Sequence, residues 1–108
     1  MAQVQLDGRT ITGWDAFHDQ CTTAFGFPGF YGRNMNAWID CLTDVRSGDG
    51  MSRFELGPEE LLIIEVLDAE AFNRQVPEVF DALVECTASV NRRQIEAGER
   101  PALYLLVR

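Results

Sequence analysis

One apolar run in the second half of the chain limits the possible folds more than any other feature. Leu61 to Leu67 reads LLIIEVL and ends at Asp68. Its length and its Ile and Val residues favour a strand over a helix. A nearly continuous apolar run is typical of a central strand that is covered on both faces of a parallel sheet. We therefore predict a buried central strand at this place.

Two shorter segments predict the neighbouring strands. Ala2 to Leu6 alternates between apolar and polar residues and is followed by Asp7-Gly8, a turn signal. Ala102 to Val107 follows Pro101 and is again mainly apolar. The chain therefore supplies three strands, one at each end and one between them.

Apolar residues at helical spacing occur through most of the first half of the chain and predict two helices. Thr12, with Asp15 three residues on, resembles a capping box that opens a helix. Asn34 is a good N-cap for a second helix to about Asp44. The residues expected to face the core are Trp14, Phe17, Cys21 and Phe25 in the first helix, and Trp38, Cys41, Leu42 and Val45 in the second.

Two further helices are expected after the central strand. Asp68 is placed to cap a short helix through about Arg74, and Pro77 fits the first turn of a long helix that ends near Gly98. The expected inner stripe of the long helix is Phe80, Leu83, Val84, Thr87 and Val90. Strands separated by helices imply a parallel sheet with helical crossovers. We predict one α/β domain over residues 1–108, with Arg46 to Glu60 as a surface excursion.

The charge of the chain limits the class of partner. Seventeen Asp and Glu residues against nine basic residues, all of them Arg, give a net charge of −8. A negative field repels phosphate backbones and attracts basic proteins over about 8 Å at physiological salt. Nucleic-acid binding is therefore disfavoured, and a basic protein partner is favoured, although the same charge would also keep any small protein soluble.

Cysteine usage and hydropathy indicate the compartment. Cys21, Cys41 and Cys86 are widely spaced, odd in number and set among apolar neighbours. This pattern favours buried, reduced thiols over a disulfide framework or a metal site. No secretory signal is visible, and no apolar run is long enough to span a membrane. We expect a cytoplasmic protein that does not associate with membranes.

Residues for catalysis or metal binding are sparse. His18 is the single histidine and lies one position off an apolar stripe, where a histidine at the edge of the core is the simpler interpretation. The glycines match no phosphate-binding motif, and no serine lies in a nucleophile-elbow sequence. The sequence therefore predicts no enzyme, no metal and no cofactor. An enzyme or ligand site at the sheet edge remains an alternative that Asp7, Asp68 and Arg108 do not support.

The segment from Phe30 to Asp44 has features that the fold alone does not require. It begins within GFPGFYG, Gly26 to Gly32, a loop of aromatic, glycine and proline residues, and continues into a helix. The helix after it has Asn36 and Asp40 four residues apart on a face away from Trp38. An acid flanked by apolar residues, beside a rigid aromatic loop, is typical of an interface anchor.

The string FPGFYGRNMNAWIDCLTD, Phe27 to Asp44, resembles the signature segment of the barstar family of intracellular ribonuclease inhibitors. The aromatic pair, Gly-x-Asn and Asp-Cys-Leu-Thr at fixed spacing carry the resemblance. It implies a two-layer α/β fold in which a three-stranded parallel sheet packs on one side against about four helices. It also implies that the protein is not an enzyme and occludes the active site of a basic ribonuclease made by the same cell.

The resemblance also implies the contact residues and the stoichiometry. Asp40 matches the main acidic anchor, and the protein is expected to be monomeric when free and to bind one nuclease without a cofactor. The matched partner-binding residues are Phe30, Gly32, Asn34, Met35, Asn36, Ile39, Asp40, Thr43 and Val45.

Three positions depart from the family pattern. Asn36 is neutral where the family has an acid, Val45 replaces a tryptophan, and Arg93 lies near acidic positions of the last helix. These departures reduce charge complementarity to the family's nuclease. They favour an alternative in which an immunity or regulatory module of the same fold binds a different toxin or a host protein.

Overall fold

The computed structural model describes residues 2–108 and contains three strands and four α-helices, as expected. Met1, the first residue of the predicted domain, lies outside this range. The elements in chain order are β1 (Ala2–Asp7), the 3₁₀ turn η1 (Gly8–Thr10), α1 (Trp14–Phe25), α2 (Met35–Thr43), the 3₁₀ turn η2 (Asp44–Arg46), β2 (Leu62–Leu67), α3 (Ala69–Gln75), α4 (Pro77–Glu96) and β3 (Leu103–Val107).

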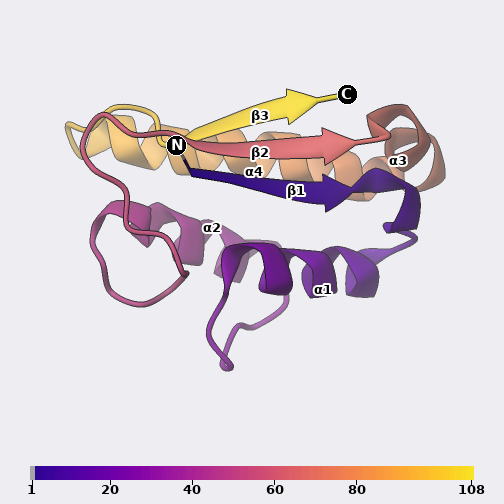
Figure 1. Ribbon diagram of the computed structural model, residues 1–108, viewed down its shortest axis with the longest axis horizontal. Coiled ribbons are helices and arrows are strands. Elements are labelled where there is room, and N and C mark those ends of the chain that lie inside the picture. Colours follow the sequence, from indigo (N-terminus) through magenta and orange to yellow (C-terminus); the bar gives the residue numbers. More distant parts are fainter. Residues whose placement is uncertain (1) are drawn as a thin grey trace.

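The sheet is parallel throughout, with the order β1-β2-β3 (Figure 1). Leu62 of β2 is paired with Ala2 of β1 and with Leu103 of β3. The apolar run therefore forms the central strand, as predicted. Parallel neighbours need long crossovers, and α1, α2, α3 and α4 lie in those crossovers.

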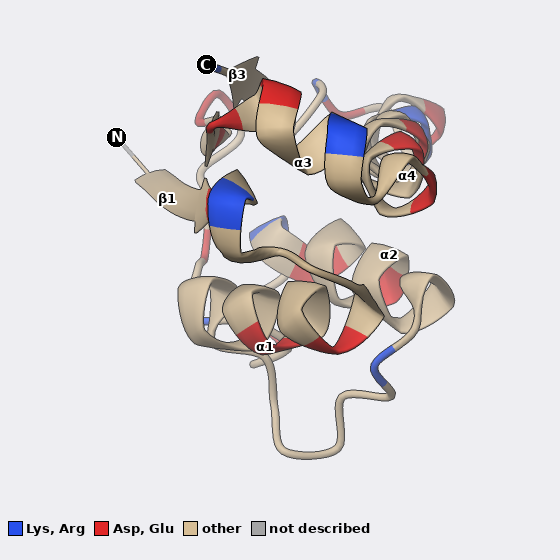
Figure 2. Ribbon diagram, turned by 90° about the vertical axis from the view of Figure 1, so that its right-hand side faces the viewer, with Lys and Arg blue, Asp and Glu red and all other residues tan. Residues whose placement is uncertain are grey.

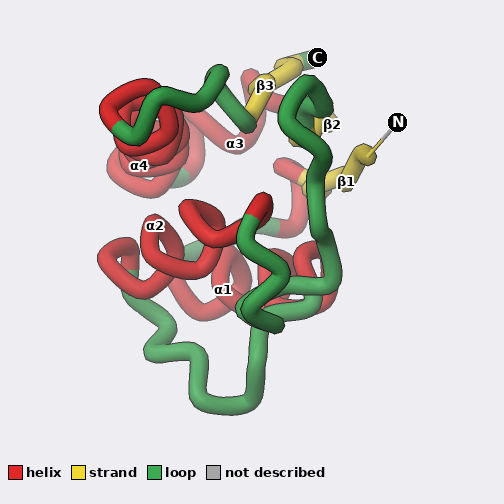
Figure 3. Tube along the Cα trace, turned by 90° about the vertical axis from the view of Figure 1, so that its left-hand side faces the viewer, coloured by secondary structure: helices red, strands yellow, loops and turns green. Residues whose placement is uncertain are grey.

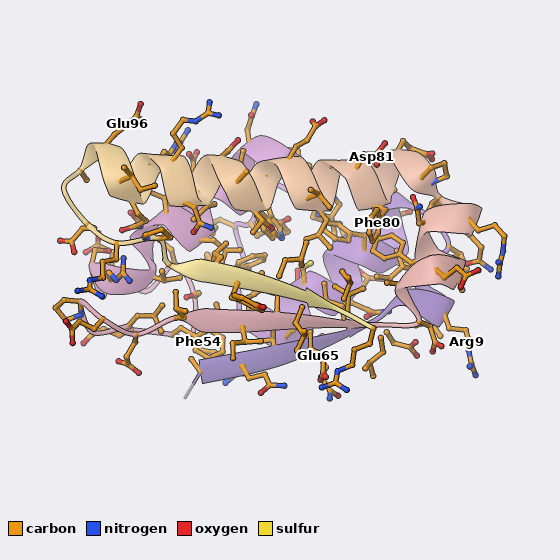
Figure 4. All side chains as sticks on the ribbon, turned by 90° about the horizontal axis from the view of Figure 1, so that it is seen from above. Arg9, Phe54, Glu65, Phe80, Asp81 and Glu96 are labelled. Atoms are coloured by element: carbon orange, nitrogen blue, oxygen red, sulfur yellow. The ribbon has the colours of Figure 1, made fainter. Side chains whose placement is uncertain are left out.

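The helices cover one face of the sheet only, as the family resemblance implied, so the second covering layer that the apolar run predicted for the central strand is wrong (Figure 3). Gln3 and Gln5 of β1 are exposed on the open face. Glu65 of β2 lies on the side of the sheet away from α4 (Figure 4). Glu65 is buried there because its Oε1 accepts a 2.7 Å hydrogen bond from the Gln5 amide and its Oε2 lies 2.5 Å from Nε of Arg108.

The core lies between the sheet and the helices, and most of the predicted inner positions are buried there. Two calls were wrong. Trp14 is 40% exposed, and Val84 is exposed while Val79 is buried in its place. Side chains one position apart on a helix differ by about 100° in direction, so the exact edge of the buried stripe depends on the neighbouring elements. The fully buried large side chains are Leu6, Ile11, Phe17, Phe25, Trp38, Leu42, Val45, Leu62, Ile64, Val66, Phe72 and Leu83.

Helix starts agree with the sequence signals in three cases out of four, although only one of these, Asn34, makes a side-chain capping bond. Pro77 begins α4, and Asn34 caps α2 through its side chain. Gly13, not Thr12, is the N-cap of α1, and it offers no side chain to the first turn. Asp68 precedes α3 in a left-handed conformation and makes no side-chain capping bond.

The predicted surface excursion after η2 lacks regular structure but is attached to the core. Leu56 is buried, and its N–H donates to the carbonyl of Val45 at 2.7 Å. The guanidinium of Arg46 donates to the carbonyls of Gly57, Glu60, Arg100 and Pro101. Arg46 therefore joins this segment to the turn before β3. None of the helices among residues 2–108 is long and apolar enough to cross a membrane.

Candidate functional site

The aromatic loop between α1 and α2 is anchored by two of its three aromatic residues. Phe27 and Tyr31 are buried, with ring centroids 4.4 Å apart, and the N–H of Tyr31 donates to the carbonyl of Pro28 at 2.9 Å. Phe30, between them, is 75% exposed. The loop projects from the helical layer (Figure 2). The burial of its neighbours therefore holds an aromatic ring in solvent on an ordered backbone.

Gly26 fixes where this loop leaves α1. Its backbone is left-handed, with φ of 67°, and its N–H donates to the carbonyl of Thr22 at 3.0 Å, which is a common way for a helix to end. A Cβ at this position would lie 2.9 Å from Cβ of Arg53. Both the conformation and the close approach of Arg53 require glycine here.

His18 couples α1 to the loop. Its Nδ1 lies 2.7 Å from the hydroxyl of Tyr31, and its ring stacks on Trp14. The imidazole is buried, and burial is the main reason that its pKa is below the ordinary value of 6.5; Arg33 lowers the pKa further, and the carboxylates of Asp15 and Asp19 oppose both effects. This histidine serves the packing of the loop, and was expected only at the edge of the core.

Arg33 fixes the far end of the loop. Its backbone is left-handed, with φ of 51°, which is uncommon for a residue with a side chain. Its guanidinium lies 2.9 Å from the carboxylate of Asp19 and donates to the main-chain carbonyl of Asp15 at 3.1 Å. These contacts to α1 hold the chain in the conformation that leads into α2.

Asn34 then starts α2. Its Oδ1 accepts the N–H of Ala37 at 2.8 Å, and its Nδ2 donates to the carbonyl of Gly32 at 3.1 Å. The side chain thus satisfies a free N–H of the first turn and closes the end of the loop. Because both groups of Asn34 are used internally, its main role is to orient the loop against the helix.

The α2 helix has one buried face and one exposed face, as predicted. Trp38 and Leu42 are completely buried. Met35 and Ile39 are half-buried, packed against the edge of the core. Asn36 and Asp40, one turn apart, are exposed, and both lie on the surface of α2 that follows the loop.

Asp40 has an intramolecular partner that the sequence did not predict. The Nη1 atom of Arg93, on α4, lies 2.8 Å from Oδ1 of Asp40. Both side chains remain open to solvent, with 64% of Asp40 and 49% of Arg93 exposed. The two helices pack side by side, and acidic positions are spread over all four helices (Figure 2). The candidate acidic anchor is therefore part of an ion pair in the free protein.

The two remaining candidates, Thr43 and Val45, lie at or just after the end of α2 and differ in their exposure to solvent. Thr43 is half-buried, its hydroxyl donates to the carbonyl of Ile39 at 2.7 Å, and its own carbonyl accepts the amide of Gln94 at 2.7 Å. Val45 is completely buried. It has no exposed surface to offer a partner and is therefore removed from the candidate contact residues, because its side chain fills the core beneath the excursion.

Eight of the nine candidate residues are at least partly exposed, on one stretch that runs from the loop along α2. They are Phe30, Gly32, Asn34, Met35, Asn36, Ile39, Asp40 and Thr43. Sequence reasoning named His18 and Arg93 but did not predict the contacts by which His18, Arg33 and Arg93 position or neutralise members of this set. The charges of Arg33 and Arg93 are visible in the sequence. Their pairing could not be predicted, because the carboxylates that they contact lie 14 and 53 residues away.

Among residues 2–108, no group of three or more His, Cys, Asp or Glu side chains is arranged to hold a metal ion. What this surface offers chemically is one exposed aromatic ring, one carboxylate with its arginine, and amide and apolar groups between them. Such a set suits recognition of another surface.

Comparison with known proteins relates most of the chain to one protein family. Residues 1–106 match the protein-family model described as "Barstar (barnase inhibitor)". A protein of Bacillus subtilis (strain 168) named "Putative ribonuclease inhibitor YrdF" is 40% identical over 43 residues, which cover 40% of this chain and 47% of that protein. The match thus spans about half the length of this curated relative.

Proposed function

The chain belongs to the barstar family, and from this membership and the geometry of the loop and α2 we propose that it binds a basic ribonuclease and blocks its active site. Members of the family are inhibitors and not enzymes. In this mechanism the protein carries out no chemical step. It covers the cleft and excludes RNA.

Phe30 is the observation that carries the proposal. A phenylalanine that is 75% exposed gains nothing from burial in the free protein. It stands on a backbone fixed by the buried Phe27 and Tyr31, so little conformational entropy is lost when a partner covers it. Rigid aromatic side chains that become buried are typical dominant contributors to binding free energy.

Asp40 supplies the electrostatic part. A ribonuclease cleft binds phosphate through cationic groups, and a carboxylate that enters the cleft forms charge-assisted hydrogen bonds with them. Asp40 is exposed, one turn beyond Asn36 on the same face of α2. The net charge of −8 attracts a basic nuclease from a distance and raises the association rate at low salt.

The proposed complex contains one inhibitor and one nuclease, with an interface of about 1,600 Å² in total, the usual size for such pairs. The protein is monomeric when free, acts in the cytoplasm and needs no cofactor. The ribonuclease is made by the same cell, so the inhibitor protects the cell that produces it.

In a second candidate function, the same surface binds another toxin or a host protein instead of a ribonuclease. The pairing of Asp40 with Arg93 and the neutral Asn36 favour it, because both reduce the negative charge offered to a cationic cleft. Inhibition of a ribonuclease separates the two candidates.

The test is a titration of ribonuclease activity with the purified chain, using barnase and the ribonucleases in medium and lysate of the source cells. We expect stoichiometric loss of activity with at least one of these enzymes. Phe30→Ala should raise the inhibitor concentration needed at least tenfold, whereas Tyr104→Ala, which removes an exposed aromatic ring from β3, should not change it. Inhibition that is equally sensitive to both variants would contradict the proposed surface, and no inhibition of any of these enzymes would contradict the function.

A further inference from the structure

We propose that Trp14 belongs to the surface that binds the ribonuclease, and that the groove beside it takes an apolar side chain of that enzyme. The groove has a volume of about 290 Å³ and lies between the start of α1 and the start of α2, two helices beside the aromatic loop (Figure 2). This inference rests on the proposed function and adds a contact on α1. The residues that line the groove are Trp14, His18, Arg33, Asn34 and Met35.

Trp14 presents an exposed aromatic ring on a fixed support. The residue is 40% exposed. Its ring stacks on His18, with centroids 5.8 Å apart, and meets the ring of Phe17 edge-on, with centroids 6.1 Å apart. Both of these neighbours are buried. A partner that covers Trp14 therefore removes apolar surface from water at little cost in conformational entropy, as is typical of a tryptophan that contributes strongly to binding.

The groove is continuous with the proposed contact surface. Asn34 and Met35 line the groove and are also candidate contact residues at the start of α2. The carbonyl of Gly32, another candidate, accepts the side-chain amide of Asn34 at 3.1 Å. A partner that covers the end of the loop and the first turn of α2 therefore meets the groove, and it needs no second interface to reach Trp14.

Trp14 and the aromatic loop share one support. Nδ1 of His18 lies 2.7 Å from the hydroxyl of Tyr31, and the burial of Tyr31 anchors the loop that exposes Phe30. Trp14 stacks on the same imidazole. The two exposed rings, Trp14 and Phe30, are thus held relative to each other by buried side chains before a partner binds.

The chemistry of the groove indicates what it takes. The guanidinium of Arg33 lies 2.9 Å from the carboxylate of Asp19, and the side-chain amide of Asn34 is bound at both ends by main-chain groups. These polar groups are therefore already used within the chain. A polar side chain would lose its hydration in the groove and gain few hydrogen bonds, whereas an apolar side chain has no such cost. The remaining walls, Trp14 and Met35, suit an aliphatic or aromatic side chain of the ribonuclease.

The direct test follows the environment of Trp14 in the complex. The chain holds two tryptophans, Trp14 and Trp38, and 5-fluorotryptophan labels both, while the ribonuclease stays unlabelled. The probe is barnase or, where barnase is not inhibited, the source-cell ribonuclease that the parent inhibits. The fluorine resonance of an exposed ring shifts between H₂O and D₂O. The completely buried Trp38 is the internal reference, and Trp14→Phe assigns the two signals.

We expect the solvent shift of Trp14 in the free protein and its loss in the complex. In a perdeuterated, fluorine-labelled chain, Overhauser contacts from the Trp14 fluorine should reach methyl or aromatic protons of the ribonuclease, which identify the side chain in the groove. Both readouts use the chain with its natural side chains at all other positions, so they do not depend on whether a substituted protein folds.

Affinity separates direct contact from support of the loop. We expect Trp14→Ala to raise Kd about tenfold or more, Trp14→Phe, which keeps a ring on His18, to raise it less, and Tyr104→Ala to leave it unchanged. In the Phe30→Ala background, Trp14→Ala should weaken binding by the same factor as in the parent. Independent contacts are additive, whereas a residue that acts only through the loop loses its effect once the ring of Phe30 is gone. Thermal unfolding checks the fold of each variant.

The outcomes distinguish this inference from the proposed function. A solvent shift of Trp14 that persists in the complex, Overhauser contacts to protons of polar side chains alone, or an effect of Trp14→Ala that disappears in the Phe30→Ala background would overturn the inference, although the ribonuclease is bound. If the parent inhibits no ribonuclease in the titration described above, the proposed function fails, and the inference fails with it.

Discussion

The imidazole Nδ1 of His18 and the hydroxyl of Tyr31 lie 2.7 Å apart, and this contact joins the first helix to the aromatic loop. Both groups are buried, and neither lies on the candidate contact surface itself. The pair therefore determines how firmly the loop is held, and hence how rigidly Phe30 is presented.

Replacement of Tyr31 by phenylalanine tests this contact. The Tyr31→Phe variant keeps the ring against Phe27 and removes only the hydroxyl, which leaves a buried nitrogen of His18 without its partner. We expect a loss of about 1–3 kcal/mol in the free energy of unfolding, the usual cost of an unsatisfied buried polar group. Urea unfolding measures this loss. Tyr104→Phe, at an exposed tyrosine, is the control, and its free energy of unfolding should stay within about 0.5 kcal/mol of the parent. Equal stability of the two variants would show that the contact does not hold the loop.

The same histidine predicts a pH dependence of stability. Burial, and after it Arg33, lowers the pKa of His18 in the folded protein below 6.5, whereas the unfolded chain keeps the ordinary value. Between the folded pKa and 6.5 the unfolded state binds more protons, so stability falls as the pH is lowered through this window and levels off below the folded pKa. A His18→Gln variant should lack this component.

The measurement is urea unfolding of parent and His18→Gln between about pH 7 and pH 4, where acids of both proteins also titrate. Because His18 is the single histidine, the difference between the two curves isolates its contribution. The parent should lose stability relative to the variant as the pH falls. A constant difference across the window would mean that the pKa of His18 is not lowered.

The sequence predicted the strands, the helices and most of the core because those features depend on local periodicity. It predicted the surface of α2 because Asn34 and the stripe around Trp38 fix which residues face outward. It could not predict the contacts of Arg46, whose main-chain acceptors lie up to 55 residues away and carry no sequence signal. The apolar run of β2 did not indicate the open face of the sheet, which the family resemblance implied, because Glu65 is buried there by polar side chains rather than by a second layer.

Arg46 gives a prediction about the excursion over residues 47–61. Its guanidinium donates to four main-chain carbonyls. Arg46→Met therefore keeps an aliphatic side chain of similar length but leaves these four acceptors without their cationic donor. We expect a loss of about 1.5–3 kcal/mol, the range for hydrogen bonds to a charged group. Amide hydrogen exchange should also become faster in residues 47–61. Arg100→Met, which removes only an exposed ion pair with Glu59, is the control and should leave exchange unchanged; equal effects of the two would contradict the role of Arg46.

The three thiols should react in a fixed order. Burial raises the pKa of the completely buried Cys21 to about 12 and also raises the pKa of Cys41 and of Cys86. Cys86 is the least buried of the three, so it should be alkylated first under native conditions, and Cys21 only at the rate of unfolding. Peptide mapping of an iodoacetamide time course gives the order. Labelling of Cys21 before Cys86 would contradict the packing of α1.

The central prediction concerns Asp40 and Asn36. Both are exposed on the same face of α2, so neither Asp40→Ala nor Asn36→Ala opens a cavity in the core. Asp40→Ala removes a surface ion pair with Arg93, worth about 0–1 kcal/mol, and should leave the melting temperature within a few degrees of the parent.

In the complex the two replacements should differ. Loss of Asp40 leaves cations of the nuclease buried and without a counter-charge, at a cost of about 2–5 kcal/mol in binding. Loss of Asn36 removes one uncharged hydrogen-bonding group, at about 1 kcal/mol. Titration calorimetry of both variants against the nuclease that the parent inhibits gives the two values. Binding of Asp40→Ala as tight as that of the parent would show that this face of α2 is not the functional one, and a large fall in its melting temperature would show that Asp40 acts through the fold.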